Sequence, residues 1–341
     1  MEHFIDHISI KNFKSIRDLK IEGLKRINLF VGKPNVGKSN ILEAFGIFSL
    51  PYLKFNSNKD ISSFIRMENY AEVFYDGITQ NGIEININNQ RAQIYLEKSV
   101  EFNDISMNIE SLHFNIKSEK GESMIYLMPI KTPLNTNINI IGKTDLSIKK
   151  YDFRIGTKVK KDGNGFLVPP FGSNLMKIIE TNSNLKKEII GLFDEYGHNL
   201  VFDKGSGELK VTKPPKNNEI FLIPFNSIAD TLQRVIFFKT AIASNTYSTL
   251  IFEEPEAHAF PPYIVHITQE IVESKSNQFI ISTHSPYVLN DFIDNAIDDL
   301  AIFMVDYKKG ETVVNKLTSD DISDILQYGI DLFTNYETFI K

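Results

Sequence analysis

The sequence predicts an α/β fold, in which a mixed sheet is flanked by helices and carries an inserted β-rich lobe. Buried apolar runs of strand length alternate with helical patterns near both ends of the chain, which is typical of α/β proteins. A glycine-rich pattern joins one of these runs directly to a helical segment. Between about residues 75 and 155, short alternating segments follow one another without a helix of crossover length, which predicts an inserted antiparallel sheet.

The elements expected before the insertion start with a strand at residues 4–10, whose apolar and polar positions alternate. A turn at 12–15, strands at 16–21 and 27–31, an apolar-faced helix at 40–50 and a loop with a short helix at 55–67 follow. Inside the insertion, Asn, Gly, Lys and Asp separate short strands at 82–89, 92–98, 111–118, 123–130, 138–143 and 151–155.

The remainder of the chain begins with a strongly helical stretch at 173–196 and a hairpin at 200–212. Strands are then expected at 219–224, 249–252, 278–282, 300–306 and 311–316, with helices at 227–243, 262–274 and from 319. We therefore divide the chain into an N-terminal core lobe (1–85), the insertion (86–215) and a C-terminal core lobe (216–341).

Composition excludes several classes of protein. The 341 residues suffice for about two domains, and 42% hydrophobic and 23% charged residues are ordinary for a globular protein. The absence of cysteine rules out disulfides and thiolate zinc sites. No apolar run approaches the ~18 residues that span a bilayer, and the charged N-terminus is unlike a signal peptide. We expect a cytoplasmic protein with no membrane segment.

The most informative segment is the loop between the strand at 27–31 and its helix. Gly32, Gly37, Lys38 and Ser39 fit the pattern G-x-x-x-x-G-K-[ST] without mismatch. Such a loop directs backbone N–H groups at phosphate, and the helix N-terminus favours the anion. We expect Lys38 to reach the β- and γ-phosphates of ATP and the Ser39 hydroxyl to bind Mg²⁺. The other loop residues expected at the nucleotide are Asn35, Val36 and Asn40. A chance glycine turn is disfavoured by the flanking strand and helix.

Two adjacent carboxylates, Glu253 and Glu254, end the buried strand at 249–252. This places them at the carboxyl edge of the sheet, where ligands of α/β folds bind. Because neighbouring side chains of a strand point to opposite sides, one carboxylate cannot perform both tasks. We assign Glu253 to Mg²⁺ and Glu254 to the attacking water. The alternative is that the two carboxylates are merely a solvated, charged strand end. The presence of Lys38 and Ser39 in the same chain disfavours it.

His284 follows the buried strand at 278–282. A histidine at this strand end can donate to a γ-phosphate oxygen and sense its loss, so we expect Lys38, Glu254 and His284 to be the catalytic residues. His258 lies just past the carboxylates and is expected near a protomer interface. The remaining histidines are interpreted as packing or surface residues.

The glycine-rich loop, the paired carboxylates and His284 follow one another in this order, with a long insertion after the loop. Together they resemble an ABC-type AAA/P-loop ATPase of the SMC/RecF/OLD class. The resemblance covers residues 8–48 and 219–307. It implies that the turn with Asn12 and Lys14 lies beside the nucleotide, and that residues 255–258 lie at a dimer seam. Heptads for long coiled-coil arms are absent, and the 57 residues after His284 leave no room for the Toprim nuclease domain of OLD nucleases.

The resemblance further implies a segment that closes on the ATP of a second protomer. Residues 227–234, opening a predicted helix, are the candidate, with Ser227 as N-cap and Ala229 and Asp230 near the phosphate. Ala229 and Thr231 stand where the family usually has glycine, and Glu253 stands where transporter-like relatives have aspartate. Gln80 is a weak candidate for the family's glutamine loop.

The implied activity is Mg²⁺-dependent ATP hydrolysis in a nucleotide-gated homodimer or higher homo-oligomer. The role that we favour is the sensor or scaffold ATPase of a prokaryotic anti-phage system, such as the PARIS-like ones, with a separate effector protein. The alternative is a RecF/SMC-like ATPase that binds DNA in repair or maintenance.

A local excess of basic residues bears on the DNA alternative, in a chain of net charge −6. These residues could form a phosphate-backbone track, although a solvated sheet surface explains them equally well. They are Lys143, Lys149, Lys150, Arg154, Lys158, Lys160, Lys161, Lys204, Lys210, Lys213 and Lys216.

Overall fold

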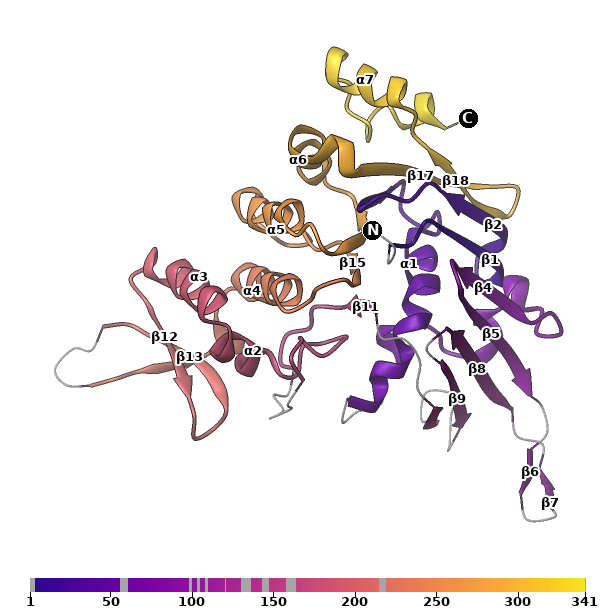
Figure 1. Cartoon of the computed structure of the whole chain (residues 1–341), viewed down its shortest axis with the longest axis horizontal. Helices are drawn as coiled ribbons and strands as arrows, with labels where there is room; N and C mark the ends of the chain where they lie inside the picture. Colours follow the sequence, from indigo (N-terminus) through magenta and orange to yellow (C-terminus); the bar gives the residue numbers. More distant parts are fainter. Residues whose placement is uncertain are drawn as a thin grey trace.

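The computed structural model describes residues 4–55, 61–97, 100–102, 105–107, 110–119, 121–129, 136–142, 147–157, 164–214 and 219–340. Within these residues, no helix has both the length and the apolar character needed to cross a membrane. Figure 1 shows the arrangement, with the core sheet and its helices in the centre and the inserted strands to the right.

The core is a six-stranded mixed sheet of order β11-β15-β16-β3-β17-β18. All neighbouring pairs are parallel except β17 and β18, which form an antiparallel hairpin. The central strands are almost entirely apolar because helices or a second sheet cover both faces. The strand bounds are β3 Ile27–Val31, β11 Ile148–Tyr151, β15 Thr249–Glu253, β16 Gln278–Thr283, β17 Leu300–Lys308 and β18 Glu311–Lys316.

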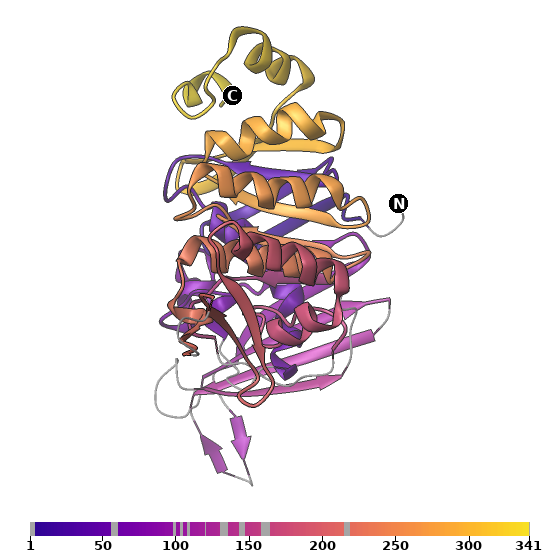
Figure 2. The same ribbon diagram turned by 90° about the vertical axis from the view of Figure 1, so that its left-hand side faces the viewer.

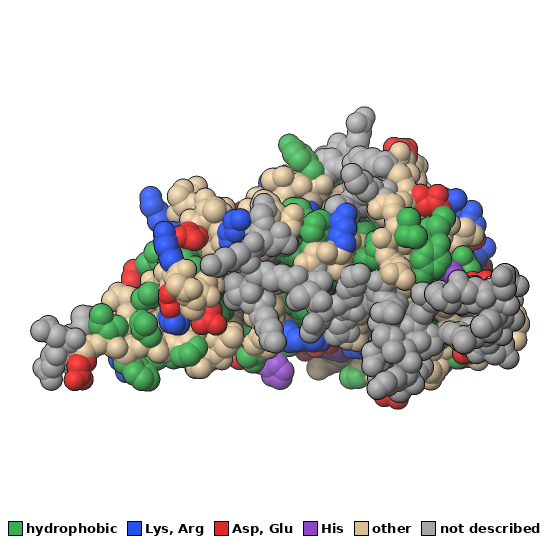
Figure 3. All heavy atoms as spheres, turned by 90° about the horizontal axis from the view of Figure 1, so that it is seen from below, with side chains coloured by type: hydrophobic (Ala, Val, Ile, Leu, Met, Phe, Trp, Pro, Cys, Tyr) green, Lys and Arg blue, Asp and Glu red, His purple; other side chains and the backbone are tan. Residues whose placement is uncertain are grey.

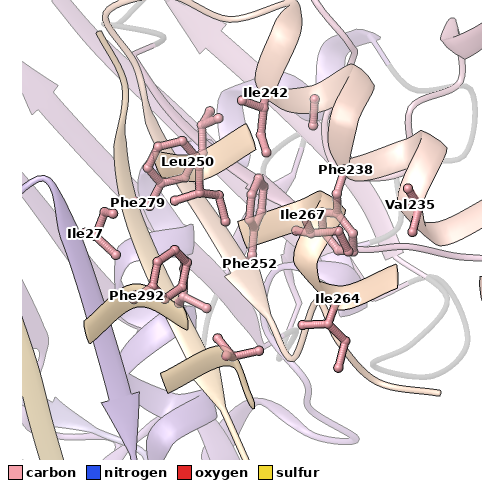
Figure 4. Close-up of a cluster of buried hydrophobic side chains, with 14 of the residues drawn as sticks. Ile27, Val235, Phe238, Ile242, Leu250, Phe252, Ile264, Ile267, Phe279 and Phe292 are labelled. Atoms are coloured by element: carbon pink, nitrogen blue, oxygen red, sulfur yellow. The ribbon is translucent and has the colours of Figure 1, made fainter. Parts of the chain in front are cut away.

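Three helices cover one face of this sheet. They are α4 (Asp230–Ala243), α5 (Pro261–Glu273) and α6 (Pro286–Ala296), stacked in tiers in Figure 2. Apolar side chains of these helices pack against the strands, as Phe238 does on Phe252 with ring centroids 4.8 Å apart. Figure 4 shows this core from Val235 and Ile264 on the helices to Leu250 and Phe279 on the strands.

The other face of the core sheet packs on α1 (Lys38–Gly46), and beyond α1 lies a second, antiparallel sheet. Its order is β10-β9-β8-β5-β4-β1-β2. The bounds are β1 His7–Phe13, β2 Ile16–Glu22, β4 Ile83–Ile87, β5 Gln90–Glu97, β8 Ser111–Ser118, β9 Gly121–Pro129 and β10 Thr136–Gly142. A small hairpin, β6 (Val100–Phe102) and β7 (Ile105–Met107), projects from it.

A third unit lies beside α4. It contains α2 (Leu175–Thr181), α3 (Ser183–Asp194) and the three-stranded sheet β12 (Asn199–Asp203), β13 (Glu208–Thr212) and β14 (Leu222–Pro224). The chain ends with α7 (Ser319–Tyr328) above α6. Short 3₁₀ segments are Ile47–Phe55, Ile61–Ser63, Tyr70–Val73, Tyr75–Gly77, Phe225–Ser227, Ile297–Asp299 and Tyr336–Phe339.

The structure confirms the α/β fold with its mixed sheet, flanking helices and antiparallel insertion, and it corrects several elements. The helical stretch expected at 173–196 is two helices, α2 and α3, and the helix expected at 40–50 ends at Gly46. The strand expected at 151–155 ends at Tyr151 and pairs in parallel with β15, so it belongs to the core sheet. The buried strand expected at 219–224 is a short, largely exposed edge strand. The helix expected from 227 begins at Asp230, because Ile228 and Ala229 have extended ψ angles of 173° and 132°. The division at residues 85 and 215 stays a prediction.

Candidate nucleotide site

The site lies at the carboxyl edge of the core sheet, where three parallel strands end together. β15 ends at Glu253, which is level with Ser282 of β16, and Thr283 of β16 is level with Val31 of β3. The loops that follow these strands carry the glycine-rich segment, the paired carboxylates and His284. Strand register therefore brings together residues that are about 250 positions apart in the chain.

The glycine-rich loop requires its glycines for steric reasons. Gly37 has φ of +103°, and a Cβ there would lie 2.1 Å from Thr312 Oγ1. A Cβ at Gly32 would lie 2.3 Å from the carbonyl oxygen of Val305. Asn35 also has positive φ, at 62°, a region that asparagine tolerates better than most residues. Val36 is buried, so its contribution at a nucleotide would be made by its backbone.

The Lys38 ammonium lies inside this loop. Its Nζ donates hydrogen bonds to the carbonyl oxygens of Gly32 (2.8 Å) and Lys33 (2.7 Å). Burial lowers the pKa of Lys38 to about 8, although the carboxylates of Glu254 and Glu253 act in the opposite direction. The ammonium is thus held at the place where a phosphate group would enter.

Glu253 and Ser39 form the oxygen pair that was predicted to bind Mg²⁺. The two side chains are hydrogen-bonded to each other. Burial acts to raise the pKa of Glu253, but Lys150, Ser39 and Arg66 together hold it below its usual range. The Arg66 guanidinium is 2.9 Å from Glu253 Oε1, and the Lys150 ammonium is 3.9 Å from Oε2. The carboxylate is therefore ionised, as a hard cation requires of a ligand.

Glu254 faces the other catalytic candidate. Its Oε1 is 3.4 Å from His284 Nε2, whereas Glu253 contacts Ser39, Arg66 and Lys150. The two adjacent carboxylates thus have separate environments. Because β15 ends at Glu253, this separation comes from the backbone of Glu254 and not from strand alternation. Glu254 has φ of 44°, and its N–H donates to the carbonyl oxygen of Ser282 (3.0 Å). This left-handed backbone is sparsely populated for a non-glycine residue and is common at functional sites.

The surroundings of His284 favour the neutral form of its imidazole. Burial lowers its pKa, the positive charge of Lys38 lowers it further, and Glu254 acts in the opposite direction. A neutral imidazole beside a carboxylate can donate one N–H to an anion without adding a full charge.

The sequence analysis missed a cluster of charged residues behind the site. The Glu43 side chain on α1 is fully buried, and it pairs with the ammonium of Lys14 and with Arg66 (2.8 Å). Arg66 in turn reaches Glu253, and Lys150 lies buried beside it. Nothing in the local pattern marks Arg66, which stands in a polar loop more than 180 residues from its second partner. Lys14, expected at the nucleotide, points in this structure at Glu43 and at the carbonyl oxygen of Arg66 (2.6 Å).

This cluster gives a stability prediction. Replacing Glu43 by alanine leaves Lys14 and Arg66 without their common carboxylate, and breaking a buried pair in this way typically costs roughly 3 kcal/mol. We expect urea unfolding of Glu43→Ala to report a loss of that order. The exposed Glu68 on the same segment as Arg66 provides the control, Glu68→Ala, which should stay within about 0.5 kcal/mol of wild type. Equal stabilities for the two variants would contradict the prediction.

A second network supports the loop from the side of β18. Thr312 Oγ1 donates to the carbonyl oxygen of Val36 (3.0 Å) and is 2.6 Å from Ser15 Oγ. Asn40 Nδ2 donates to the same Ser15 hydroxyl (2.6 Å). Asn12, with φ of 57°, donates to the carbonyl oxygen of Gly82 (3.2 Å) and so holds the neighbouring turn. Asn40 is thus connected to the loop through Ser15 and Thr312, whereas the side chain of Asn12 contacts the turn before β4.

The segment at the start of α4 departs from the sequence prediction. Ser227 is not the N-cap, because the helix starts three residues later with Ala229 at that position and no side-chain cap. Within the described residues, no hydrogen bond or ion pair joins Ser227, Ala229 or Asp230 to the glycine-rich loop. Thr231 Oγ1 instead donates to the carbonyl oxygen of His258 (3.1 Å), which links the segment to the residues after the carboxylates.

One further expectation is not met, and another stays a prediction. Gln80, the weak candidate for the glutamine loop, lies exposed in the turn before β4. Lys149 and Lys150 are buried and cannot form part of a surface track, because β11 is covered on both faces. Lys143, Lys158, Lys160, Lys161 and Lys216 lie outside the described residues. On the face seen in Figure 3, the coloured basic side chains lie scattered among acidic, hydrophobic and other side chains.

Comparison with known proteins shows what the chain is similar to. A family model described as "AAA domain, putative AbiEii toxin, Type IV TA system" matches residues 27–290. The Septu protein PtuA of Bacillus mycoides is 22% identical over 339 residues, covering 93% of this chain and 43% of that protein. The DNA replication and repair protein RecF of Lactobacillus acidophilus is 31% identical over 62 residues, covering 18% of this chain and 16% of that protein. The chain thus spans less than half the length of either relative.

Among solved structures, one described as an SmcHead bound to the C-winged helix domain of ScpA is similar to this chain. It has 15% sequence identity and a TM-score of 0.49, and the match covers 94% of this chain and all of that one.

Proposed function

This chain belongs to the family of AAA domains described as putative AbiEii toxins of type IV TA systems, as an ABC-type ATPase of the SMC/RecF class, and from this premise we propose that it is a dimeric switch driven by ATP hydrolysis. The observation that carries the proposal is the site itself. Lys38, Ser39, the two carboxylates and His284 come from three separate segments and meet at one edge of the sheet.

The residues present fit a nucleotide and Mg²⁺. Gly32 and Gly37 let the loop pack against Val305 and Thr312, where a Cβ would not fit, and the Ser39 hydroxyl with the ionised Glu253 supplies hard oxygen donors. In the described part of the chain, no group of three or more His, Asp or Glu side chains could hold a metal ion alone. The ion would therefore depend on phosphate oxygens for its remaining ligands.

Each side chain has a distinct task in this proposal. When bound, Mg²⁺ neutralises charge on the β- and γ-phosphates. Lys38 exchanges its two loop carbonyls for phosphate oxygens, and Ser39 and Glu253 hold the ion. Glu254 orients the attacking water and accepts its proton, while the neutral His284 donates a hydrogen bond to the transferred group.

A second protomer would complete each site. The N-terminus of α4 has no side-chain cap, so its backbone N–H groups are available to an anion. Because no hydrogen bond or ion pair between described residues joins this segment to the loop of its own chain, we propose that Ser227, Ala229 and Asp230 meet the nucleotide of a partner subunit. Closure would then depend on ATP, and hydrolysis would release it.

For the biological role, we propose a defence ATPase that works with a separate effector. The similarity to the Septu protein extends along nearly the whole chain, whereas the RecF similarity is confined to 62 residues. A RecF-like role in DNA maintenance remains the alternative. It is weakened by the burial of Lys149 and Lys150, which were counted in the basic track.

The proposal is tested with the purified chain by phosphate release and by light scattering after size exclusion. We expect Mg²⁺-dependent ATP hydrolysis, together with a dimer or a larger assembly when ATP is present. A chain that binds ATP but neither hydrolyses it nor associates would overturn the proposed switch.

The DNA alternative has its own prediction. We expect phosphate release to change by less than about twofold when double-stranded DNA is added at low salt. The reason is that two of the lysines predicted to form a track, Lys149 and Lys150, are buried. Stimulation of several-fold that falls steeply as salt rises would favour the RecF-like role, since phosphate contacts release counterions. Filter binding across a salt series provides the independent measurement.

A further inference from the structure

Glu256 lies two residues after the catalytic pair and has no role in the site as described so far. It is only 8% exposed. Its Oε1 accepts a hydrogen bond from the Thr283 hydroxyl (2.6 Å) and another from the backbone N–H of His284 (3.1 Å). One carboxylate oxygen therefore ties the segment after β15 to the last residues of β16.

These contacts fix the backbone that carries the side chain of His284. The Thr283 hydroxyl donates to Glu256 and at the same time accepts from the N–H of Ser285 (3.0 Å). His284 is therefore held on both sides, by its own N–H and by the hydroxyl that organises the next residue. Its imidazole projects from this clamp to within 3.4 Å of Glu254.

Stability alone does not explain a carboxyl group at this place. Burial raises the pKa of Glu256, and its second oxygen, Oε2, is buried without a hydrogen-bond partner among the described residues. Leaving a buried polar atom unpaired costs free energy. A side chain that costs stability, yet is aimed at the backbone of a catalytic residue, is better explained by positioning.

We propose that Glu256 is a positioning residue, which holds His284 in register with Glu254 through the Thr283 hydroxyl and the His284 N–H. The proposal rests on the ATPase function proposed above. Both hydrogen bonds to Glu256 Oε1 come from Thr283 and His284, so in this proposal its effect passes through the histidine. Loss of the clamp leaves Lys38 and the glycine-rich loop unchanged.

Steady-state ATPase kinetics of Glu256→Ala test the proposal. We expect kcat to fall by about 10-fold to 100-fold, which is the range for a misplaced catalytic group, while KM for ATP stays within about twofold. Glu256→Gln retains an acceptor oxygen and matches a neutral carboxyl group, so it should keep most of the activity. Thr283→Ser should also be active, whereas Thr283→Val, which removes the hydroxyl, should fall between wild type and Glu256→Ala.

The decisive measurement is the double variant. If Glu256 acts through His284, Glu256→Ala combined with His284→Ala will have the same kcat as His284→Ala alone. A purely structural role predicts that the two losses multiply, and that result would overturn the proposal. So would unchanged kcat in Glu256→Ala, or a glutamine variant as impaired as the alanine variant.

Two controls separate folding and function from positioning. Glu273→Ala removes an exposed carboxylate at the far end of α5 and should leave kcat unchanged. If Glu256→Ala does not fold, the comparison of Thr283→Val with Thr283→Ser, each with and without His284→Ala, decides the same question. A wild-type chain without ATPase activity would contradict the proposed function, whereas an active wild type with unaffected variants would contradict the positioning role alone.

Discussion

Glu254→Gln is expected to trap the ATP-bound chain as a dimer. The variant keeps the size of the side chain and one oxygen within reach of His284, but it cannot accept a proton from the attacking water. Loss of a general base typically lowers the rate by about 10²-fold to 10⁴-fold. Because ATP would still bind through Lys38 and Ser39, the closed state would persist. Size exclusion with light scattering, on samples incubated with ATP and Mg²⁺, measures the effect.

Glu253→Gln serves as the matched control, since it changes the adjacent carboxylate in the same way. Glu253 contacts Ser39, Arg66 and Lys150 and not His284. We therefore expect this variant to weaken the Mg²⁺ dependence of binding and to form less dimer. A Glu254→Gln variant that stays monomeric with ATP and hydrolyses it at the wild-type rate would contradict the assignment of Glu254.

The parts of the site that could be predicted from sequence are those that consist of contiguous residues. Gly32 to Ser39 form one continuous motif, and the carboxylates and His284 each stand at the end of a buried strand. Parallel strands end at the same edge, so their meeting follows from the α/β pattern. Strand alternation also predicted different directions for Glu253 and Glu254, but in the structure it is the left-handed backbone of Glu254, just beyond the end of β15, that separates them. These assignments of individual roles stay predictions until the variants are measured.

The parts that could not be predicted depend on contacts between distant segments. Arg66 stands in a polar loop, and only the fold brings it to Glu43 and Glu253. Lys150 looked like a surface residue of the insertion because adjacent lysines suggest a solvated strand. The structure buries it, since β11 is a member of the core sheet. Thr312 supports the glycine-rich loop through Val36, which is 276 residues away in the chain, and the sequence does not give the register of the hairpin that places it there.

The start of α4 illustrates a different limit. Ser227 has the chemistry of an N-cap, and serine before an apolar run is a sound local signal. The segment instead forms a 3₁₀ turn at Phe225–Ser227, and two extended residues delay the helix until Asp230. The resulting N-terminus lacks a side-chain cap. In the proposed dimer, an anion would take the place that the serine hydroxyl was expected to fill.

Lys38→Ala is expected to abolish productive ATP binding. Hydrogen bonds to charged groups contribute about 1.5–3 kcal/mol each, so losing the ammonium should weaken ATP binding by at least about tenfold. ATP at 100 times its dissociation constant stabilises a protein by about 2.7 kcal/mol. We therefore expect ATP with Mg²⁺ to raise the melting temperature of the wild type, and to have little effect on the variant. Thermal melts with and without the nucleotide give the measurement.

Two comparisons separate the loss of charge from damage to the loop. Lys38→Met keeps the buried apolar stem and removes the ammonium, so it should fold like the wild type and still fail to respond to ATP. Lys25→Ala removes an exposed lysine where β3 begins, at the opposite edge of the sheet, and should respond normally. If Lys38→Met were stabilised by ATP as strongly as wild type, the loop would not be the nucleotide site. The ammonium is held by two loop carbonyls at 2.8 and 2.7 Å, and burial lowers its pKa to about 8. Both observations describe a buried ammonium that an anionic ligand would stabilise. The methionine variant removes that ammonium alone.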